Sequence, residues 1–290
     1  MTNVVSSIQP SADAVRAAPT TLHVQDLAFS YPGQEPLFDG FDWQVASDEA
    51  WAVIGPSGCG KSTLLYLLAG LRQPSSGQIW VSGQELVRPR PQTGLILQDY
   101  GLLPWATVGE NAALGLRVRR FYGPDGRHAP QDGRVEKAAI GQRVDWWLER
   151  LGIAHLRDKY PAQISGGQRQ RTAIARTLAM QPDLLLMDEP FSSLDALTRE
   201  DLERLMLELR DETGVTTIVV THNIEEAVYL GRRLMLLGQP PHSEGIIIKN
   251  PKGGQLDYRE HPDFQARCNQ VRERLGEPGA VPGKRSHAQA

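Results

Sequence analysis

Cysteine is scarce in this sequence: Cys59 and Cys268 are the only two in 290 residues. Two cysteines provide neither a disulfide framework nor a zinc-binding set, and they are typical of a reducing compartment. Apolar runs are short, because no segment reaches the ~18 residues that a membrane-spanning helix needs. The N-terminus lacks the basic start and apolar core of a secretion signal. We therefore expect that the chain is neither exported nor inserted into a membrane by itself.

Basic charge is not in excess either, since the formal net charge is -3. A protein that binds duplex nucleic acid usually has a basic face, so we do not expect nucleic acid as the main partner, although a local basic patch stays possible. The composition, with 40% hydrophobic and 22% charged residues, is ordinary for a globular protein. A chain of this length has room for one large core or two modest domains.

One glycine-rich segment, GPSGCGKS at 55–62, fits the phosphate-binding pattern G-x-x-x-x-G-K-[ST]. A strand-like run, Trp51–Ile54, precedes it and a run of helical composition, Ser62–Ala69, follows it. Glycines let the backbone approach a polyphosphate, Lys61 would contact the β and γ phosphates, and Ser62 would bind Mg²⁺. The alternative is a flexible glycine turn. The predicted nucleotide contacts here are Gly55, Pro56, Ser57, Gly58, Cys59, Gly60, Lys61, Ser62 and Thr63.

Two apolar runs end in polar residues that carry chemistry. Leu184–Met187 has the composition of a strand buried on both faces and leads into Asp188 and Glu189. We expect Asp188 to hold Mg²⁺, directly or through water, and Glu189 to orient and deprotonate the attacking water. Thr217–Thr221 ends in His222 in the same way, at the strand end where ligands bind, so His222 is expected to contact the γ phosphate. The alternatives are acids that cap a strand end and a structural histidine.

The motifs together resemble the ATP-binding subunit of an ABC transporter. GPSGCGKS is similar to its Walker A motif, LLLMDEP to Walker B, ISGGQ (164–168) to the signature, SSLD (192–195) to the D-loop and THN (221–223) to the H-loop. The resemblance covers about 22–249. It implies an α/β P-loop NTPase with a RecA-like parallel-sheet core, an N-terminal antiparallel β region and an inserted helical subdomain. It also implies an ATPase whose cofactors are ATP and Mg²⁺.

The resemblance also implies roles that spacing alone does not give. Tyr31 is expected to stack on adenine and Gln98 to contact Mg²⁺ and the water. The alternatives are an ordinary strand-end aromatic and a solvated loop amide. In this family the signature serves the nucleotide of a second subunit, so ATP lies between two subunits. Ile164 stands where the family usually has leucine, a volume-conserving change. The residues expected to act in trans are Ser165, Gly166, Gly167, Gln168 and Asp195.

The chain divides into segments of different character. We expect a disordered N-terminus (1–19), an ATPase domain (20–250) with a helical subdomain at about 102–160, a helical tail (251–276) and a flexible end (277–290). Gly and Pro predict a loop at 119–134, either a plain surface loop or a partner contact. Helical spacing predicts two apolar faces, one formed by Ile140, Val144, Trp147, Leu148 and Leu151 and the other by Phe264, Cys268, Val271 and Leu275.

The segment LLPWATVGENAALGL at 102–116 is similar to importer ATPases of the nitrate, sulfonate, taurine and bicarbonate group. The resemblance implies a homodimer or a heterodimer with a homologous subunit, permease subunits, and indirectly a solute-binding protein. It also implies a peripheral place on the cytoplasmic face of the plasma membrane. Trp105 is then a candidate anchor for the permease, the alternative being local packing.

Three further hypotheses concern the whole chain or a single thiol. A soluble ABC ATPase of DNA repair or translation is the main alternative, but it would carry zinc-spaced cysteines, long coiled coils or two cassettes. A P-loop kinase is a weaker one, because it has no use for ISGGQ. Cys59, close to Lys61 and a helix N-terminus, is expected either to have a lowered thiol pKa or to be a small residue that fits.

Overall fold

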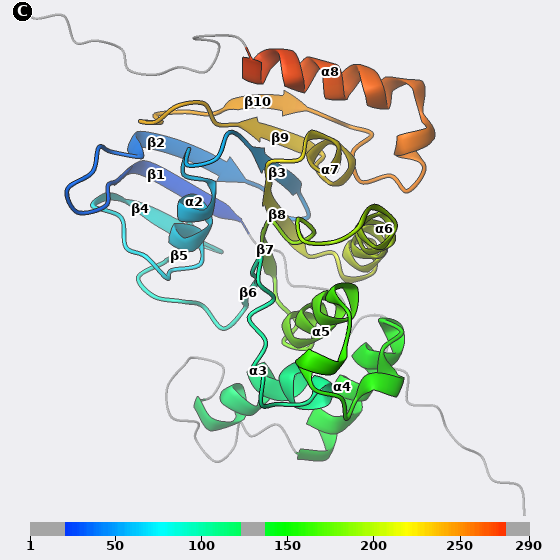
Figure 1. The fold of residues 1–290 in the computed structure, drawn as a ribbon. Helices are drawn as coiled ribbons and strands as arrows, with labels where there is room; N and C mark the ends of the chain where they lie inside the picture. The colour runs from blue at the N-terminus through cyan, green and yellow to red at the C-terminus, as the bar shows by residue number, and fades with distance from the viewer. Residues whose placement is uncertain (1–20, 123–136, 277–290) are drawn as a thin grey trace, which may run out of the picture.

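The computed structural model describes residues 21–122 and 137–276, and it contains two sheets with helices packed around them (Figure 1). The smaller sheet is antiparallel, in the order β2-β1-β4-β5, and the larger has the order β10-β9-β3-β8-β7-β6. The strands are β1 (Leu22–Phe29), β2 (Phe38–Val45), β3 (Ala50–Ile54), β4 (Ser76–Val81), β5 (Gln84–Glu85), β6 (Thr93–Ile96), β7 (Leu184–Asp188), β8 (Thr216–Thr221), β9 (Arg233–Leu236) and β10 (Ile246–Lys249).

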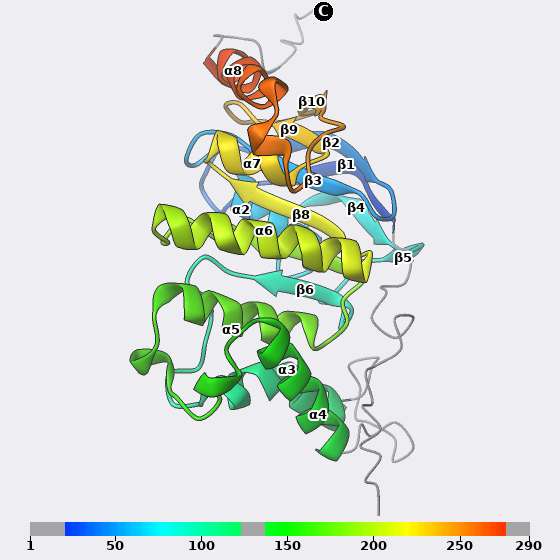
Figure 2. The same cartoon turned by 90° about the vertical axis from the view of Figure 1, so that its right-hand side faces the viewer.

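Most helices alternate with strands of the large sheet along the chain, whereas three helices follow one another between β6 and β7. They are α2 (Lys61–Leu68), α3 (Val108–Tyr122), α4 (Lys137–Arg150), α5 (Gly166–Leu178), α6 (Ala196–Thr213), α7 (Ile224–Leu230) and α8 (Pro262–Gly276), with short 3-10 turns at Ala154–Leu156, Pro161–Gln163 and Tyr258–Glu260. α3, α4 and α5 gather at one end of the molecule, whereas α8 lies at the other (Figure 1). Figure 2 shows α6 lying along the large sheet between α5 and α7. None of the helices in the described ranges is long and apolar enough to cross a membrane.

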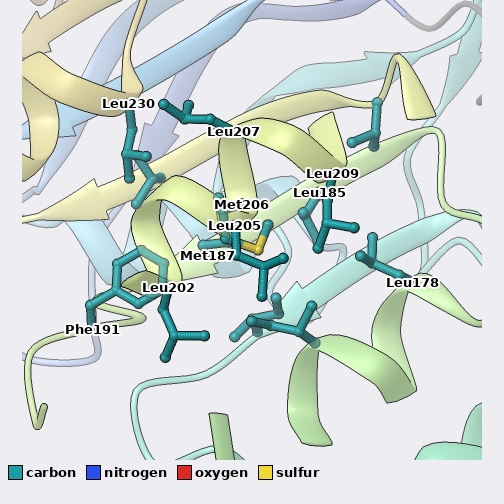
Figure 3. Close-up of a cluster of buried hydrophobic side chains, with 14 of the residues drawn as sticks. Leu178, Leu185, Met187, Phe191, Leu202, Leu205, Met206, Leu207, Leu209 and Leu230 are labelled. Carbon is teal, nitrogen blue, oxygen red and sulfur yellow. The ribbon is translucent and has the colours of Figure 1, made fainter. Parts of the chain in front are cut away.

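The central strands of the large sheet are parallel and are buried on both faces. Along β7, Leu185 and Met187 enter the core under α5 and α6, while Leu184 and Leu186 enter a second core shared with α2 and the antiparallel sheet. Figure 3 shows the first core, where β7 side chains meet those of α6. Because successive side chains of a strand point to opposite faces, a continuous apolar run is what a strand between two layers requires.

The two predicted apolar faces are confirmed. Ile140, Val144, Trp147, Leu148 and Leu151 are at most 6% exposed. In α8, Phe264, Cys268 and Val271 are buried and Leu275 packs partly against the same core. The C-terminal helix is therefore packed on the rest of the fold.

One boundary differs from the sequence predictions. Arg119–Tyr122, predicted to begin a loop, form the end of α3 instead, where the Arg119 guanidinium donates to the carbonyl oxygen of Met180 at 3.1 Å. The rest of that predicted loop lies outside the described residues, as do the predicted disordered N-terminus and flexible end. The signature helix α5 begins at Gly166 and is capped by Ser165: Gln168 N donates to Ser165 Oγ at 3.3 Å.

Candidate functional site

The glycine-rich loop joins β3 to α2. Gly60 caps α2 with a φ of 104° and no side-chain hydrogen bond, so the first amides of this helix are open to an anion. A Cβ at Gly55 would lie 2.4 Å from the carbonyl oxygen of Leu237, which leaves room only for glycine. The Lys61 ammonium curls back and donates to the carbonyl oxygens of Gly55 at 2.8 Å and Pro56 at 2.9 Å. The loop thus presents amides and one cation to the same place.

Cys59 lies in this loop, but the pKa of its thiol is not lowered as its position suggested. It is 1% exposed, and burial raises the pKa of its thiol, while the Lys61 charge lowers it less. The hypothesis of a lowered pKa is wrong because desolvation outweighs the nearby cation. Behind the loop, the buried His242 lies with Nε2 2.7 Å from the carbonyl oxygen of Cys59. His242 was missed from the sequence because it lies 183 positions away from Cys59.

Ser62 and Asp188 meet beneath the loop. Ser62 Oγ donates to Asp188 Oδ1 at 2.8 Å, and Asp188 is 5% exposed. Burial raises the pKa of Asp188, while hydrogen bonds from Ser62 and Tyr66 lower it. A hydroxyl and a carboxyl group are oxygen ligands of the kind that a hard divalent cation takes, so this pair fits Mg²⁺. Tyr66 was missed, although the i,i+4 spacing from Ser62 places both on one face of α2.

Glu189 and His222 form a second pair at neighbouring strand ends. His222 Nδ1 lies 3.0 Å from Glu189 Oε2, and the histidine is exposed while the glutamate is partly buried. Glu189 has a φ of 45°, in the left-handed region, and its N–H donates to the carbonyl oxygen of Val220 at 2.9 Å. This backbone link across β7 and β8 turns the carboxylate toward the histidine. The ends of β7 and β8 thus bring Glu189 and His222 together.

Tyr31 lies beside the same loop. Its hydroxyl is 3.1 Å from Thr63 Oγ1, and its ring packs edge-on against Phe29 with the centroids 5.1 Å apart. The Arg72 guanidinium lies over the ring, 5.0 Å from its centroid. Hydrogen bonding and packing therefore hold an aromatic face next to the start of α2.

The signature and the D-loop line a different place. Ser165 caps α5 and Asp195 caps α6, where Asp195 Oδ1 accepts from Thr198 N at 3.0 Å. Hydrogen bonds from Thr198 hold the pKa of Asp195 below its usual value. A cleft of about 620 Å³ is lined by Gln98, Asp99, Tyr100, Ser165, Gly166, Gly167, Arg169, Ser193, Leu194, Asp195 and Thr198. No residue of the glycine-rich loop is among them.

Gln98 follows β6 and joins this second group. Its Nε2 donates to Ser192 Oγ at 3.4 Å, a long hydrogen bond. Ser192 in turn donates to the carbonyl oxygen of Glu189 at 3.0 Å. Gln98 therefore stands between the Glu189 strand end and the cleft. The sequence pointed to Gln98 only through the family resemblance, and it did not single out Ser192.

The model of the family described as ABC transporter matches residues 38–192. Bicarbonate transport ATP-binding protein CmpC of Synechococcus elongatus is 39% identical over 86% of the chain and 37% of the relative, so the chain spans little more than a third of that protein. Taurine import ATP-binding protein TauB of Pseudomonas aeruginosa is 39% identical over 76% of the chain and 79% of the relative. A dimeric ATP-binding cassette solved in a post-hydrolysis state with ADP and Pi is 28% identical and has a TM-score of 0.67, over 79% of this chain and 98% of the other.

Proposed function

The chain belongs to the ABC transporter family, and from that premise we propose that it binds and hydrolyses ATP to drive solute import through separate permease subunits. The observation that carries the proposal is that the ends of β3, β7 and β8 meet. Ser62, after β3, bonds Asp188 at the end of β7, and Glu189, after β7, pairs with His222 after β8. An anion site, a divalent-cation site and a base are the parts that phosphoryl transfer to water requires.

ATP would bind along the glycine-rich loop. Lys61 would leave the carbonyl oxygens that it now contacts and bind the β and γ phosphates, while the amides at the start of α2 neutralise their charge. Tyr31 would stack on the adenine, since its ring is held in place. Ser62, Asp188 and Gln98 would hold Mg²⁺, which supplies charge neutralisation between the phosphates. Ser62 and Asp188 lie where β3 and β7 end, Gln98 follows the neighbouring β6, and Tyr31 follows β1 of the antiparallel sheet.

Hydrolysis would depend on Glu189. Its carboxylate would accept a proton from the attacking water, and His222, 3.0 Å away, would orient the carboxylate and contact the γ phosphate. Because there is little covalent chemistry in the loose transition state of phosphoryl transfer, most of the catalytic effect would come from positioning and charge.

The complete site would need two subunits. Ser165, Gly167 and Asp195 line the cleft that excludes the glycine-rich loop of their own chain, which supports an action on a nucleotide bound by a second copy or a homologous subunit. A related cassette has been solved as a dimer. ATP would lie between the subunits, so hydrolysis would be cooperative.

The transported solute would be a small anion such as bicarbonate, nitrate, a sulfonate or taurine. The names of the relatives and the segment around Trp105, which is 74% exposed, support this class. The chain would lie on the cytoplasmic face of the plasma membrane, bound to permease subunits and indirectly served by a solute-binding protein.

The test is the Glu189→Gln variant of the full chain, with MgATP binding and phosphate release measured separately. We expect binding to persist, turnover to fall by about 10²- to 10⁴-fold, and an ATP-bound dimer to accumulate in gel filtration. Glu225→Gln, an exposed glutamate on α7, is the matched control. Near wild-type turnover in Glu189→Gln would remove Glu189 from this role.

A further inference from the structure

The turn after Gln98 is fastened to α5 through the backbone of Tyr100. Tyr100 has a φ of 65°, a left-handed conformation that non-glycine residues seldom adopt, and its N–H donates to the carbonyl oxygen of Leu97 at 3.1 Å. The Arg176 guanidinium donates to the carbonyl oxygens of Tyr100, at 2.8 Å, and Gly101. These bonds hold the turn in a conformation in which Tyr100 lines the cleft.

That side chain reaches two other loops. Its hydroxyl lies 2.7 Å from Ser193 Oγ in the D-loop, the usual length for a hydrogen bond between hydroxyls. The Arg169 guanidinium of α5 lies over the ring, 5.5 Å from the centroid. A Cβ placed on Gly166 would lie 3.3 Å from the Tyr100 hydroxyl. One residue thus touches the Gln98 turn, the signature helix and the D-loop.

Gln98 itself is the weaker link to the D-loop. Its bond to Ser192 measures 3.4 Å, against 2.7 Å between Tyr100 and Ser193. Ser193 stands two residues before Asp195, the cap of α6. A displacement of the Gln98 turn would therefore reach Asp195 mainly through the tyrosine hydroxyl.

We propose that Tyr100 is a positioning residue that couples the nucleotide site of its own chain to the groups offered to the partner's nucleotide. The inference rests on the proposed function, in which Gln98 serves the first nucleotide while Ser165 and Asp195 serve the second. Without the hydroxyl, the Gln98 turn keeps only the longer Gln98–Ser192 hydrogen bond as its link to the D-loop, and the two loops move together less closely. Turnover then falls, whereas MgATP binding by Lys61 and Ser62 does not change.

The test is the ATPase activity of the full chain with Tyr100→Phe, which removes the hydroxyl and keeps the ring over Arg169. We expect kcat to fall about 3- to 10-fold, the loss of one neutral hydrogen bond in the transition state, and the Hill coefficient to fall toward one. The Kd of the monomer for MgATP stays at the wild-type value. Tyr229→Phe is the matched control, since its hydroxyl bonds the carbonyl oxygen of Leu256 at 3.1 Å, and its kinetics stay unchanged.

A double-mutant cycle with Ser193→Ala separates positioning from mere support. If Tyr100 acts through Ser193, Tyr100→Phe lowers kcat no further in the Ser193→Ala background. The inference would be overturned if the losses of kcat in the two single variants multiply in the double variant. It would also be overturned by an unchanged kcat in Tyr100→Phe, or by a raised Kd for MgATP with normal kcat. A wild-type chain that hydrolyses no ATP would overturn the proposed function and this inference with it, whereas an active wild type with an indifferent Tyr100→Phe overturns the inference alone.

Discussion

Glu226 on α7 is a carboxyl group that the fold keeps out of water. It is 2% exposed, its Oε1 has no hydrogen-bond partner among the described residues, and Thr221 bonds the carboxyl group. Burial, followed by the charge of Glu203, raises its pKa to about 8. Glu203 on α6 is 0% exposed, and burial raises its pKa to about 7 although it is paired with Arg259. Replacing Glu226 by glutamine copies the protonated form and removes the ionisable group.

The direction in which stability changes with pH follows from the number of protons that the folded and unfolded chains bind. Between pH 4.5 and about 8 the folded chain holds a proton on Glu226 that the unfolded chain has lost, so the stability of the wild type falls as pH rises through that window. With a Glu226 pKa of 4.5 in the unfolded chain and about 8 in the folded chain, the free energy of unfolding falls by about 4 kcal/mol between pH 5 and pH 9. About 2.5 kcal/mol of that fall occurs below pH 7. Glu203 adds to the fall, and the two groups titrate as a pair with Arg199, Arg259 and Glu189 in their field.

Urea denaturation at pH 5, 7 and 9 measures the effect. We expect Glu226→Gln to gain about 4 kcal/mol relative to the wild type between pH 5 and pH 9. Glu225→Gln changes an exposed neighbour on the same helix and should keep the wild-type slope. A difference between Glu226→Gln and the wild type that stays constant over this range would refute the reasoning, because the carboxyl group would then have the same pKa in both states.

Two other expectations concern single side chains. Iodoacetamide should alkylate Cys59 in the folded chain at less than about a tenth of its rate in urea, because the thiol is buried and its pKa is raised; comparable rates, read by mass spectrometry, would contradict this. Trp105→Ala should leave ATPase activity unchanged and lower the recovery of a multi-spanning partner from membranes by about 10-fold or more, as for an interface anchor. Val87→Ala, at another exposed apolar residue, is the control, and equal recovery from both variants would assign Trp105 no role in docking.

The strand ends were predictable because the parallel strands are buried on both faces. A continuous apolar run such as 184–187 stands out in the sequence, and the first polar residue after it must lie at the sheet edge. Asp188, Glu189 and His222 could therefore be assigned to one edge before any coordinates. The glycine-rich loop carried the same kind of signal.

Contacts between distant loops were not predictable in this way. Tyr100 meets Ser193 across 93 positions and His242 meets Cys59 across 183, and neither pair follows a local period. The predicted lowering of the Cys59 pKa was wrong because a neighbouring lysine is visible in the sequence whereas the depth of burial is not.

The packing of α8 limits how far this chain can be shortened from its C-terminal side. α8 contributes Phe264, Cys268 and Val271 to the core, and Arg259 just before it neutralises the buried Glu203. A version cut after β10 would leave that carboxylate unpaired in an apolar setting and uncover the core beside α7. A shortened version should therefore keep α8, which lies well past the last of the nucleotide motifs.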